Sequence, residues 1–432
     1  MPAAGRPRAY RPAQSRVRPG WWILALVVVC AVAIVTTHAL VSPASGASAG
    51  SGVGTAQWVS PGSPSSSPSS SSSPPASPSP SASLSGDACA ASIASKLSLP
   101  DQAGQVLMIG TPIATPAQLT DTVAKYHLGG VFFQGRSTQS AATLHQSIDS
   151  LQSAARSSGA VPLQIALDQE GGEVQTLKGT DFPTIPSAVS QGQLSTSALT
   201  SQTTDWATRL VHAGVSLDLA PVADTVPAGT AQDNPPIGEL DRQYGSTPDA
   251  VARDVSTVVT AAQSAGLLTT LKHFPGLGRV RANTDTSTHA VDDQTTADDP
   301  SLDPFASGIQ AGTAAVMMSS ATYPKLDSQN IAAFSSAIVT GLLRQKLGFK
   351  GLIMSDDLGA AVAASAVPVG QRAVRFIEAG GDLVLSVRSQ DAEPMADALV
   401  AQAQGSGTFA AQLVAAAQQV IASKVRAGLV SC

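Results

Sequence analysis

The stretch LLTTLKHFPGLG, residues 267–278, decides the fold class, because it joins a short apolar run to polar side chains and a turn. The run 267–271 carries no charge on either face, which is typical of a parallel strand covered on both sides. Lys272 and His273 follow as two hydrogen-bond donors, and Pro275–Gly278 predicts a rigid turn. We therefore expect a strand whose carboxyl end presents Lys272 and His273.

Short apolar runs of this kind recur eight times along the 432-residue chain. They are Gln105–Gly110, Gly130–Gln134, Leu163–Asp168, Ser216–Pro221, Leu267–His273, Ala315–Ser319, Gly351–Asp356 and Asp382–Val387. Ala- and Leu-rich segments separate them, for example Ala141–Ser157, Pro248–Ala265, Ile331–Leu347 and Ala392–Ala427. Polar residues end nearly every run, as the mouth of a closed barrel requires. The pattern predicts an α/β protein with a single (β/α)₈ barrel, and an open doubly wound sheet is the alternative.

The first 87 residues differ in composition from the rest. Residues 1–20 carry five arginines and no acid, so we expect a basic cytoplasmic segment. Residues 21–41 carry no formal charge and can span a hydrocarbon core about 30 Å thick, which predicts a transmembrane signal-anchor or signal peptide. Residues 42–87, rich in Ser and Pro, predict a disordered linker. The barrel at 88–432 would then lie outside the cell, attached to the membrane or secreted if the leader is cleaved.

Composition and charge argue against some classes of function. The net charge is −5 and only 13% of residues are charged, which argues against nucleic-acid binding. Six scattered histidines and three cysteines show no metal-ligand spacing, so we expect no metal and no cofactor. Cys89 and Cys432 lie at the two ends of the folded part, where barrel termini usually meet. We expect them to form a disulfide, with two free thiols as the alternative.

Polar groups at several strand ends could carry chemistry. Asp356 follows an apolar strand, so its carboxylate could attack a sugar carbon, or it could instead cap the next helix. Lys272 and His273 suit a hydroxyl-rich ligand, and a structural ion pair is the alternative. Asp168 and Glu170, the acids of the segment Asp168–Gly172, could accept bonds from sugar hydroxyls. The long polar segment 279–300 holds Asp285 and His289, and a long loop at a barrel mouth is often functional.

Together these elements resemble glycoside hydrolase family 3, in its β-N-acetylhexosaminidase branch. The matching motifs are Asp168–Gly172, Ala220–Asp224, Asp241–Gly245, Lys272–Gly276 and Ser355–Leu358, in family order, and the resemblance covers residues 90–427. It implies a monomeric, cofactor-free, retaining exo-glycosidase that removes terminal β-linked N-acetylglucosamine from cell-wall-derived or related glycans. By that match, Asp356 is the nucleophile. The residues that match the sugar-binding positions are Asp168, Arg242, Lys272 and His273.

The sequence departs from the branch on the loop after Lys272–Gly276. The family places an Asp-Ser-His dyad there, whose His is the acid/base. An ungapped alignment puts Asp285 at the His position, whereas a four-residue slip puts His289 there, and we favour Asp285. Glu173 and Thr176 stand where the branch often has Arg, and Leu277 where it often has His.

These departures leave two alternatives open. One is an enzyme of the same family with another specificity, such as a β-glucosidase, although the larger glucosidases of this family have two domains. The other is a catalytically silent barrel that binds the cell wall.

Overall fold

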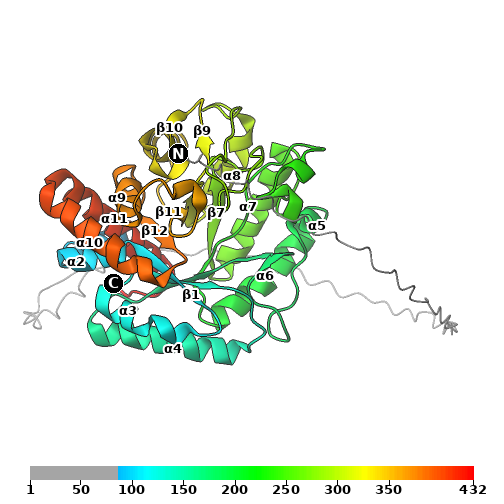
Figure 1. Cartoon of the computed structure of the whole chain (residues 1–432). Coiled ribbons are helices and arrows are strands. Elements are labelled where there is room, and N and C mark those ends of the chain that lie inside the picture. The colour runs from blue at the N-terminus through cyan, green and yellow to red at the C-terminus, as the bar shows by residue number, and fades with distance from the viewer. Residues whose placement is uncertain (1–85) are drawn as a thin grey trace, which may run out of the picture. The chain divides into compact units, whose positions relative to one another are not determined.

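The computed structural model describes residues 86–432 (Figure 1). Three of the predicted segments lie wholly or mostly outside the described residues. They are the basic segment 1–20, the apolar segment 21–41 and residues 42–85 of the predicted linker. Gly86 and Asp87, the last two residues of that linker range, begin helix α1 (Gly86–Ala94). Within residues 86–432, no helix has the length and apolar character needed to cross a bilayer.

Eight parallel strands close into a barrel, each paired with its neighbours in chain order. They are β1 (Leu107–Pro112), β2 (Gly130–Gln134), β3 (Gln164–Leu167), β6 (Leu217–Asp218), β7 (Leu268–Phe274), β8 (Ala315–Met318), β11 (Leu352–Asp357) and β12 (Leu383–Ser386). Each of the eight predicted runs overlaps one of these strands, so the predicted barrel is confirmed. The first strand begins two residues later than predicted, because helix α2 (Leu99–Gln105) continues through Gln105.

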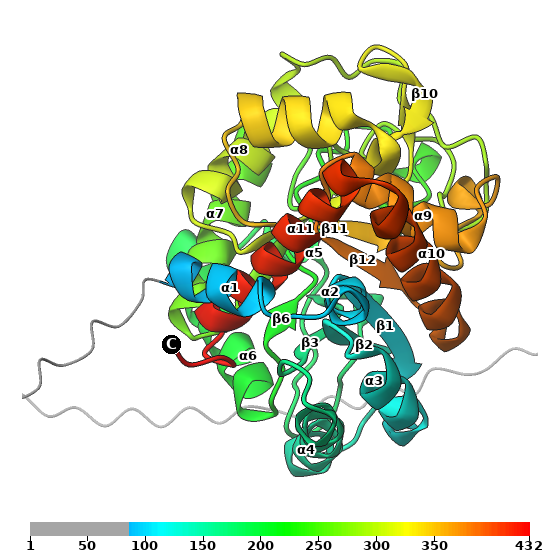
Figure 2. The same cartoon turned by 90° about the vertical axis from the view of Figure 1, so that its left-hand side faces the viewer.

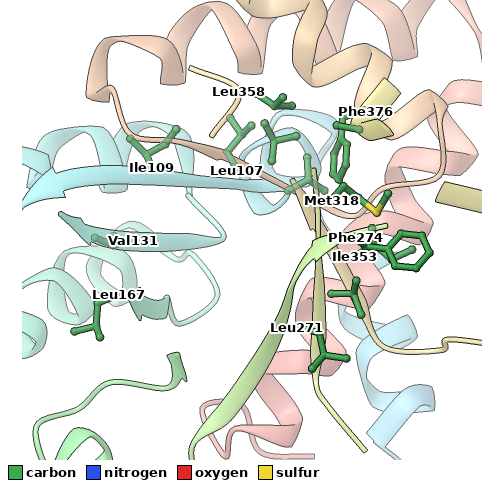
Figure 3. Packing of buried hydrophobic residues seen from close by; sticks show 14 of the residues in the cluster. Leu107, Ile109, Val131, Leu167, Leu271, Phe274, Met318, Ile353, Leu358 and Phe376 are labelled. Carbon is green, nitrogen blue, oxygen red and sulfur yellow. The ribbon is translucent and has the colours of Figure 1, made fainter. Parts of the chain in front are cut away.

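Side chains alternate across the barrel wall. Leu107 and Ile109 point toward the surrounding helices and belong to the large core cluster that also contains Val131, Leu271 and Ile353 (Figure 3). Met108, between Leu107 and Ile109, belongs to a second cluster inside the barrel. Each fully buried aliphatic side chain contributes about 1.5–3 kcal/mol relative to exposure. Burial on both faces explains why the strands show as uninterrupted apolar runs.

Helices cover the outside of the barrel (Figures 1 and 2). The principal ones are α3 (Thr120–Tyr126), α4 (Ala141–Ser158), α6 (Thr196–His212), α7 (Pro248–Ser264), α8 (Asp303–Gln310), the π-helical segment Ala337–Lys346, α9 (Val369–Glu378), α10 (Ala392–Gly405) and α11 (Gly407–Arg426). The segment predicted as Ala392–Ala427 is thus two helices, divided at Ser406. Ser406 has an extended backbone, and its hydroxyl accepts a hydrogen bond from the Phe409 N–H, which starts α11. The segment predicted from Ile331 is π-helical only from Ala337.

Helices α1 and α11 close the amino-terminal end of the barrel. They lie side by side, with the carboxyl terminus next to them (Figure 2). Val420 of α11 packs with Leu217 and Leu383, which begin their strands inside the barrel. A disulfide joins Cys89 of α1 to Cys432, with a Cα–Cα distance of 5.8 Å. This closure leaves the carboxyl ends of the strands as the open face of the barrel.

Candidate active site

A cavity of about 500 Å³ opens at the carboxyl ends of the strands. This mouth cavity is lined by six of the seven residues that the sequence indicated for sugar binding or catalysis: Asp168, Arg242, Lys272, His273, Asp285 and Asp356. The seventh, His289, is exposed on the same loop as Asp285 and does not line the cavity. Barrel closure therefore brings together residues that are far apart in the sequence.

A cluster of buried charges forms one wall of the mouth cavity. Lys272, at the end of β7, has a side chain only 3% exposed, and its Nζ lies 2.7 Å from Asp168 Oδ1 and 2.6 Å from Glu170 Oε1. Arg242 donates to both oxygens of Glu170, with Nε–Oε2 at 2.9 Å and Nη2–Oε1 at 2.7 Å. This paired geometry is among the strongest that an arginine and a carboxylate can form.

Glu170 keeps its charge in spite of its position. Burial alone would raise the pKa of the Glu170 carboxyl, but the charges of Arg242 and Lys272 outweigh it and lower that pKa to about 2. Burial lowers the pKa of Lys272, and the charges of Asp168 and Glu170 reverse this and raise it overall. Both groups are therefore ionised at neutral pH. Because Glu170 does not line the mouth cavity, it holds Arg242 and Lys272 in place for a ligand rather than contacting the ligand itself.

The sequence analysis gave Glu170 the same hydroxyl-binding role as Asp168. The structure corrects this, because Glu170 does not line the mouth cavity and its carboxylate is taken up by Arg242 and Lys272. The partners that define its role, Arg242 and Lys272, are 72 and about 100 residues away. Their closeness becomes visible only when the barrel is closed.

Asp224 fixes His273. The Asp224 carboxylate is fully buried, and its Oδ2 lies 2.8 Å from His273 Nδ1. Its Oδ1 accepts hydrogen bonds from the backbone N–H groups of His273 and Leu277, at 3.2 and 2.7 Å. A carboxylate can only accept, so we assign the Nδ1 proton to this pair. His273 Nε2 then lies 3.4 Å from Arg242 Nη2, at the cavity wall.

The two neighbouring aspartates at the end of β11 have different surroundings. Asp357 accepts backbone hydrogen bonds from Gly359, Ala360 and Val387, so it stabilises the turn that follows the strand. Burial raises the pKa of Asp357, partly opposed by those three donors. Asp356 accepts one bond, from the Asp357 N–H at 2.8 Å, and lines the mouth cavity. The helix-capping role that the sequence left open for Asp356 is not found, because the next helical turn, Val362–Ala364, and α9 both begin without a side-chain cap.

Asp285 lines the same mouth cavity as Asp168, Arg242 and Lys272. Its N–H donates to Asn283 Oδ1 at 2.8 Å, which forms a tight turn at this point of the loop. The side chain keeps contact with solvent. Partial burial in the mouth, together with the charges of Asp356 and Asp357, nevertheless raises the pKa of Asp285 to about 6. Asp285 is therefore the titratable group of this loop that faces the cavity and is poised near neutral pH.

The positions that depart from the family pattern also lie at the mouth. Thr176 and Leu277 are buried and line the cavity, whereas Glu173 is exposed. Arg136, just after β2, lines the same cavity and donates to the Glu173 carbonyl oxygen at 2.6 Å. The sequence analysis overlooked Arg136, although a polar residue after a barrel strand was the relevant signal.

Comparison with known proteins gives consistent results. The model of the glycosyl hydrolase family 3 N-terminal domain matches residues 98–423. The β-hexosaminidase of Xanthomonas campestris pv. campestris (strain B100) is 36% identical over 247 residues, which cover 54% of this chain and 71% of that protein. The β-hexosaminidase of Stenotrophomonas maltophilia (strain K279a) is 34% identical over 250 residues, covering 56% and 71%.

Two solved structures are also similar. The β-N-acetylhexosaminidase of Beutenbergia cavernae DSM 12333 is 43% identical, with a TM-score of 0.75, and the match covers 76% of this chain and 99% of that one. A glycoside hydrolase family 3 β-N-acetylglucosaminidase from Paenibacillus sp. str. FPU-7 is 28% identical, with a TM-score of 0.68, covering 77% and 63%.

Glu170→Gln is predicted to destabilise the barrel. The substitution keeps the shape of the side chain but removes the carboxylate that pairs with Arg242 and one of the two that contact Lys272. Losing one partner of a buried ion cluster costs about 3–5 kcal/mol. Denaturant unfolding of the full chain at pH 7 measures this loss. Glu393→Gln, at an exposed pair with Lys125, serves as the control and should leave the midpoint unchanged.

Acid titration extends the same test. The pKa of Glu170 is lower in the folded state than its unfolded value near 4.3, so its contribution to stability is complete above that value. The contribution is lost as the pH falls from there toward 2. Wild type should therefore lose stability over this range, and Glu170→Gln should lose less. Equal stability of the two proteins at pH 7 would contradict the role given to Glu170.

Proposed function

The chain belongs to glycosyl hydrolase family 3, and we propose that it is a retaining exo-glycosidase that hydrolyses terminal β-linked N-acetylglucosamine from cell-wall-derived or related glycans. One observation carries the proposal. A single cavity is lined both by paired donors and acceptors and by two further carboxyl groups, Asp285 and Asp356. The comparisons with β-hexosaminidases support this activity for the chain.

The paired cluster suits a terminal sugar. Asp168, which is 26% exposed, accepts bonds from hydroxyls, and Arg242, Lys272 and His273 donate to them. Because Glu170 and Asp224 already hold these donors, little side-chain entropy is lost when the sugar binds.

The two carboxyl groups supply the reaction. Asp356 attacks the anomeric carbon as its bond to the leaving oxygen breaks, and Asp285 gives its proton to that oxygen. The products of this step are a glycosyl ester on Asp356 and a free alcohol. Asp285, now ionised, takes a proton from water as the water attacks the same carbon. The sugar leaves with retained configuration, and both aspartates return to their first state.

The surroundings of Asp285 fit both parts of this role. The charge on Asp356 helps to raise the pKa of Asp285 to about 6, which favours the protonated acid before the first step. Formation of the ester removes that charge. The pKa of Asp285 then falls, which favours the ionised base needed for the second step.

Chromogenic substrates test the activity and its specificity. The full chain should release nitrophenol from the β-N-acetylglucosaminide and much less from the β-glucoside. Asp356→Asn should lower kcat/KM by about 10⁴-fold or more, the scale on which loss of a nucleophile acts. Asp121→Asn, at an exposed position of α3, is the control and should leave the rate unchanged. Release from the glucoside alone would overturn the specificity, and release from neither substrate would favour the silent barrel.

The acid/base role predicts a pH profile. Asp285 must be protonated to act as the acid, so wild-type kcat/KM should fall as the pH rises through about 6. Asp285→Asn should lose this limb and lower kcat/KM by about 10²–10⁴-fold on an aryl glycoside with a poor leaving group. Azide should restore turnover of an activated substrate. His289→Asn should retain both rate and profile, and the reverse result would assign the role to His289.

We further propose that residues 21–41 place the barrel outside the cytoplasm. The barrel is then held at the membrane, or it is secreted if the leader is cleaved. We also propose that it is a monomer. The arginine-rich start and the uncharged run support this location, and so does the Cys89–Cys432 disulfide, since disulfides persist in oxidising compartments. Cell fractionation should find the full chain in membranes or culture medium. Protease added to intact cells should release a folded barrel, and a wholly cytoplasmic chain would refute the proposal.

A further inference from the structure

The segment that follows Asp356 contacts the loop that carries Asp285. The Ala363 N–H donates to the Thr284 carbonyl oxygen at 3.0 Å, and the Val362 N–H donates to the Asp285 carbonyl oxygen at 3.4 Å. These are backbone bonds, so they act on the position of the loop rather than on one side-chain rotamer. The two carboxyl groups of the proposed reaction are therefore linked through residues 357–363.

The start of this segment is fixed to the barrel. Asp357 accepts the Val387 N–H at 3.0 Å, which ties the end of β11 to the chain just after β12. Gly359 packs so closely that a Cβ at this position would overlap Ser386 Oγ and Asp391 Oδ2. Asp356 thus projects from a rigid strand end, whereas Asp285 depends on how the rest of the segment is held.

Arg372 of α9 holds the rest of the segment. Its guanidinium donates to the carbonyl oxygens of Leu358 and Gly359 through Nη1, at 2.6 and 2.8 Å, and to Val367 through Nε at 2.7 Å. The residue is only 7% exposed. A buried guanidinium is costly unless its donors are used, and here they join the two ends of segment 358–367. Residues 362 and 363 lie between those ends.

We propose that Arg372 is a positioning residue for proton transfer: by holding segment 358–367, it sets the place of Asp285 relative to Asp356. The proposal rests on the proposed function, because it takes these aspartates as acid/base and nucleophile. Arg372 does not line the mouth cavity, so it acts through the backbone of 358–367 and of residues 284 and 285. Small displacements at a reacting centre reduce rates strongly, by up to about 100-fold for 1 Å.

Leaving-group dependence separates positioning from a general loss of folded protein. Arg372→Lys keeps the charge but cannot reach three carbonyl oxygens at once. Its kcat/KM should fall by about 10- to 100-fold on a poorly activated aryl N-acetylglucosaminide and much less on the dinitrophenyl glycoside, which needs no acid. A smaller active fraction would lower both rates equally and leave their ratio unchanged. Arg375→Lys, at an exposed position of the same helix, is the matched control.

Val362→Pro tests the contact without touching Arg372. It removes the N–H that donates to Asp285, and the preceding Ala361 already has backbone angles compatible with proline, φ −57° and ψ 125°. The rate ratio should shift in the same direction as in Arg372→Lys. If Arg372→Lys fails to fold, this variant decides the outcome: an unchanged ratio in Val362→Pro would overturn the proposal.

Hydrogen exchange tests the link without relying on activity. Peptides covering 281–290 should exchange faster in Arg372→Lys than in wild type and in Arg375→Lys, although Arg372 does not touch them. Faster exchange confined to 358–367 would overturn the link. Faster exchange at 281–290 with an unchanged rate ratio would overturn the catalytic part. Absence of wild-type turnover would refute the proposed function, and the exchange result would still decide the link.

Discussion

The buried contact of Lys272 with Asp168 and Glu170 is the interaction on which the whole mouth depends. It joins the end of β3 to the end of β7, two strands that are separated by β6 in the barrel. An ammonium group taken out of water needs its partners, because an unpaired charge in a low-dielectric site is very costly. An error in the register of either strand would therefore separate these charges and destabilise the protein. Stability and the sugar binding that we propose for these residues both require the same arrangement.

The surroundings of two carboxyl groups of similar intrinsic acidity give them very different pKa values. Glu170, between Arg242 and Lys272, has a pKa of about 2, whereas Asp285, near Asp356 and Asp357, has a pKa of about 6. Divergent pKa values among neighbouring acids are a usual sign of divided roles in a catalytic site. Here the acid paired with cations is structural, and the acid facing other carboxylates is free to exchange its proton. Burial and the charges around each group, rather than its residue type, set the pKa of each carboxyl group.

The sequence predicted the strands better than the hydrogen-bond partners, for a physical reason. Burial on both faces of a parallel strand leaves a local signal, so all eight runs were visible in the sequence. The partners of Glu170 and Arg372 depend on residues brought near by barrel closure, which no local pattern reports. Helix capping was the alternative role for Asp356, and the structure rules it out because the helices that follow begin without a side-chain cap. Asp285 and His289 were separated only by the path of the loop.

Burial and the charges of Asp356 and Asp357 together raise the pKa of Asp285. Like charges repel one another, so the loop that carries Asp285 would move away from these two residues unless other contacts opposed the repulsion. The turn at Asn283 and the backbone bonds from residues 362 and 363 provide such contacts. Those bonds in turn depend on segment 358–367, which Arg372 holds from α9. This need to keep Asp285 close to Asp356 would explain why Arg372 is buried although it does not line the mouth cavity.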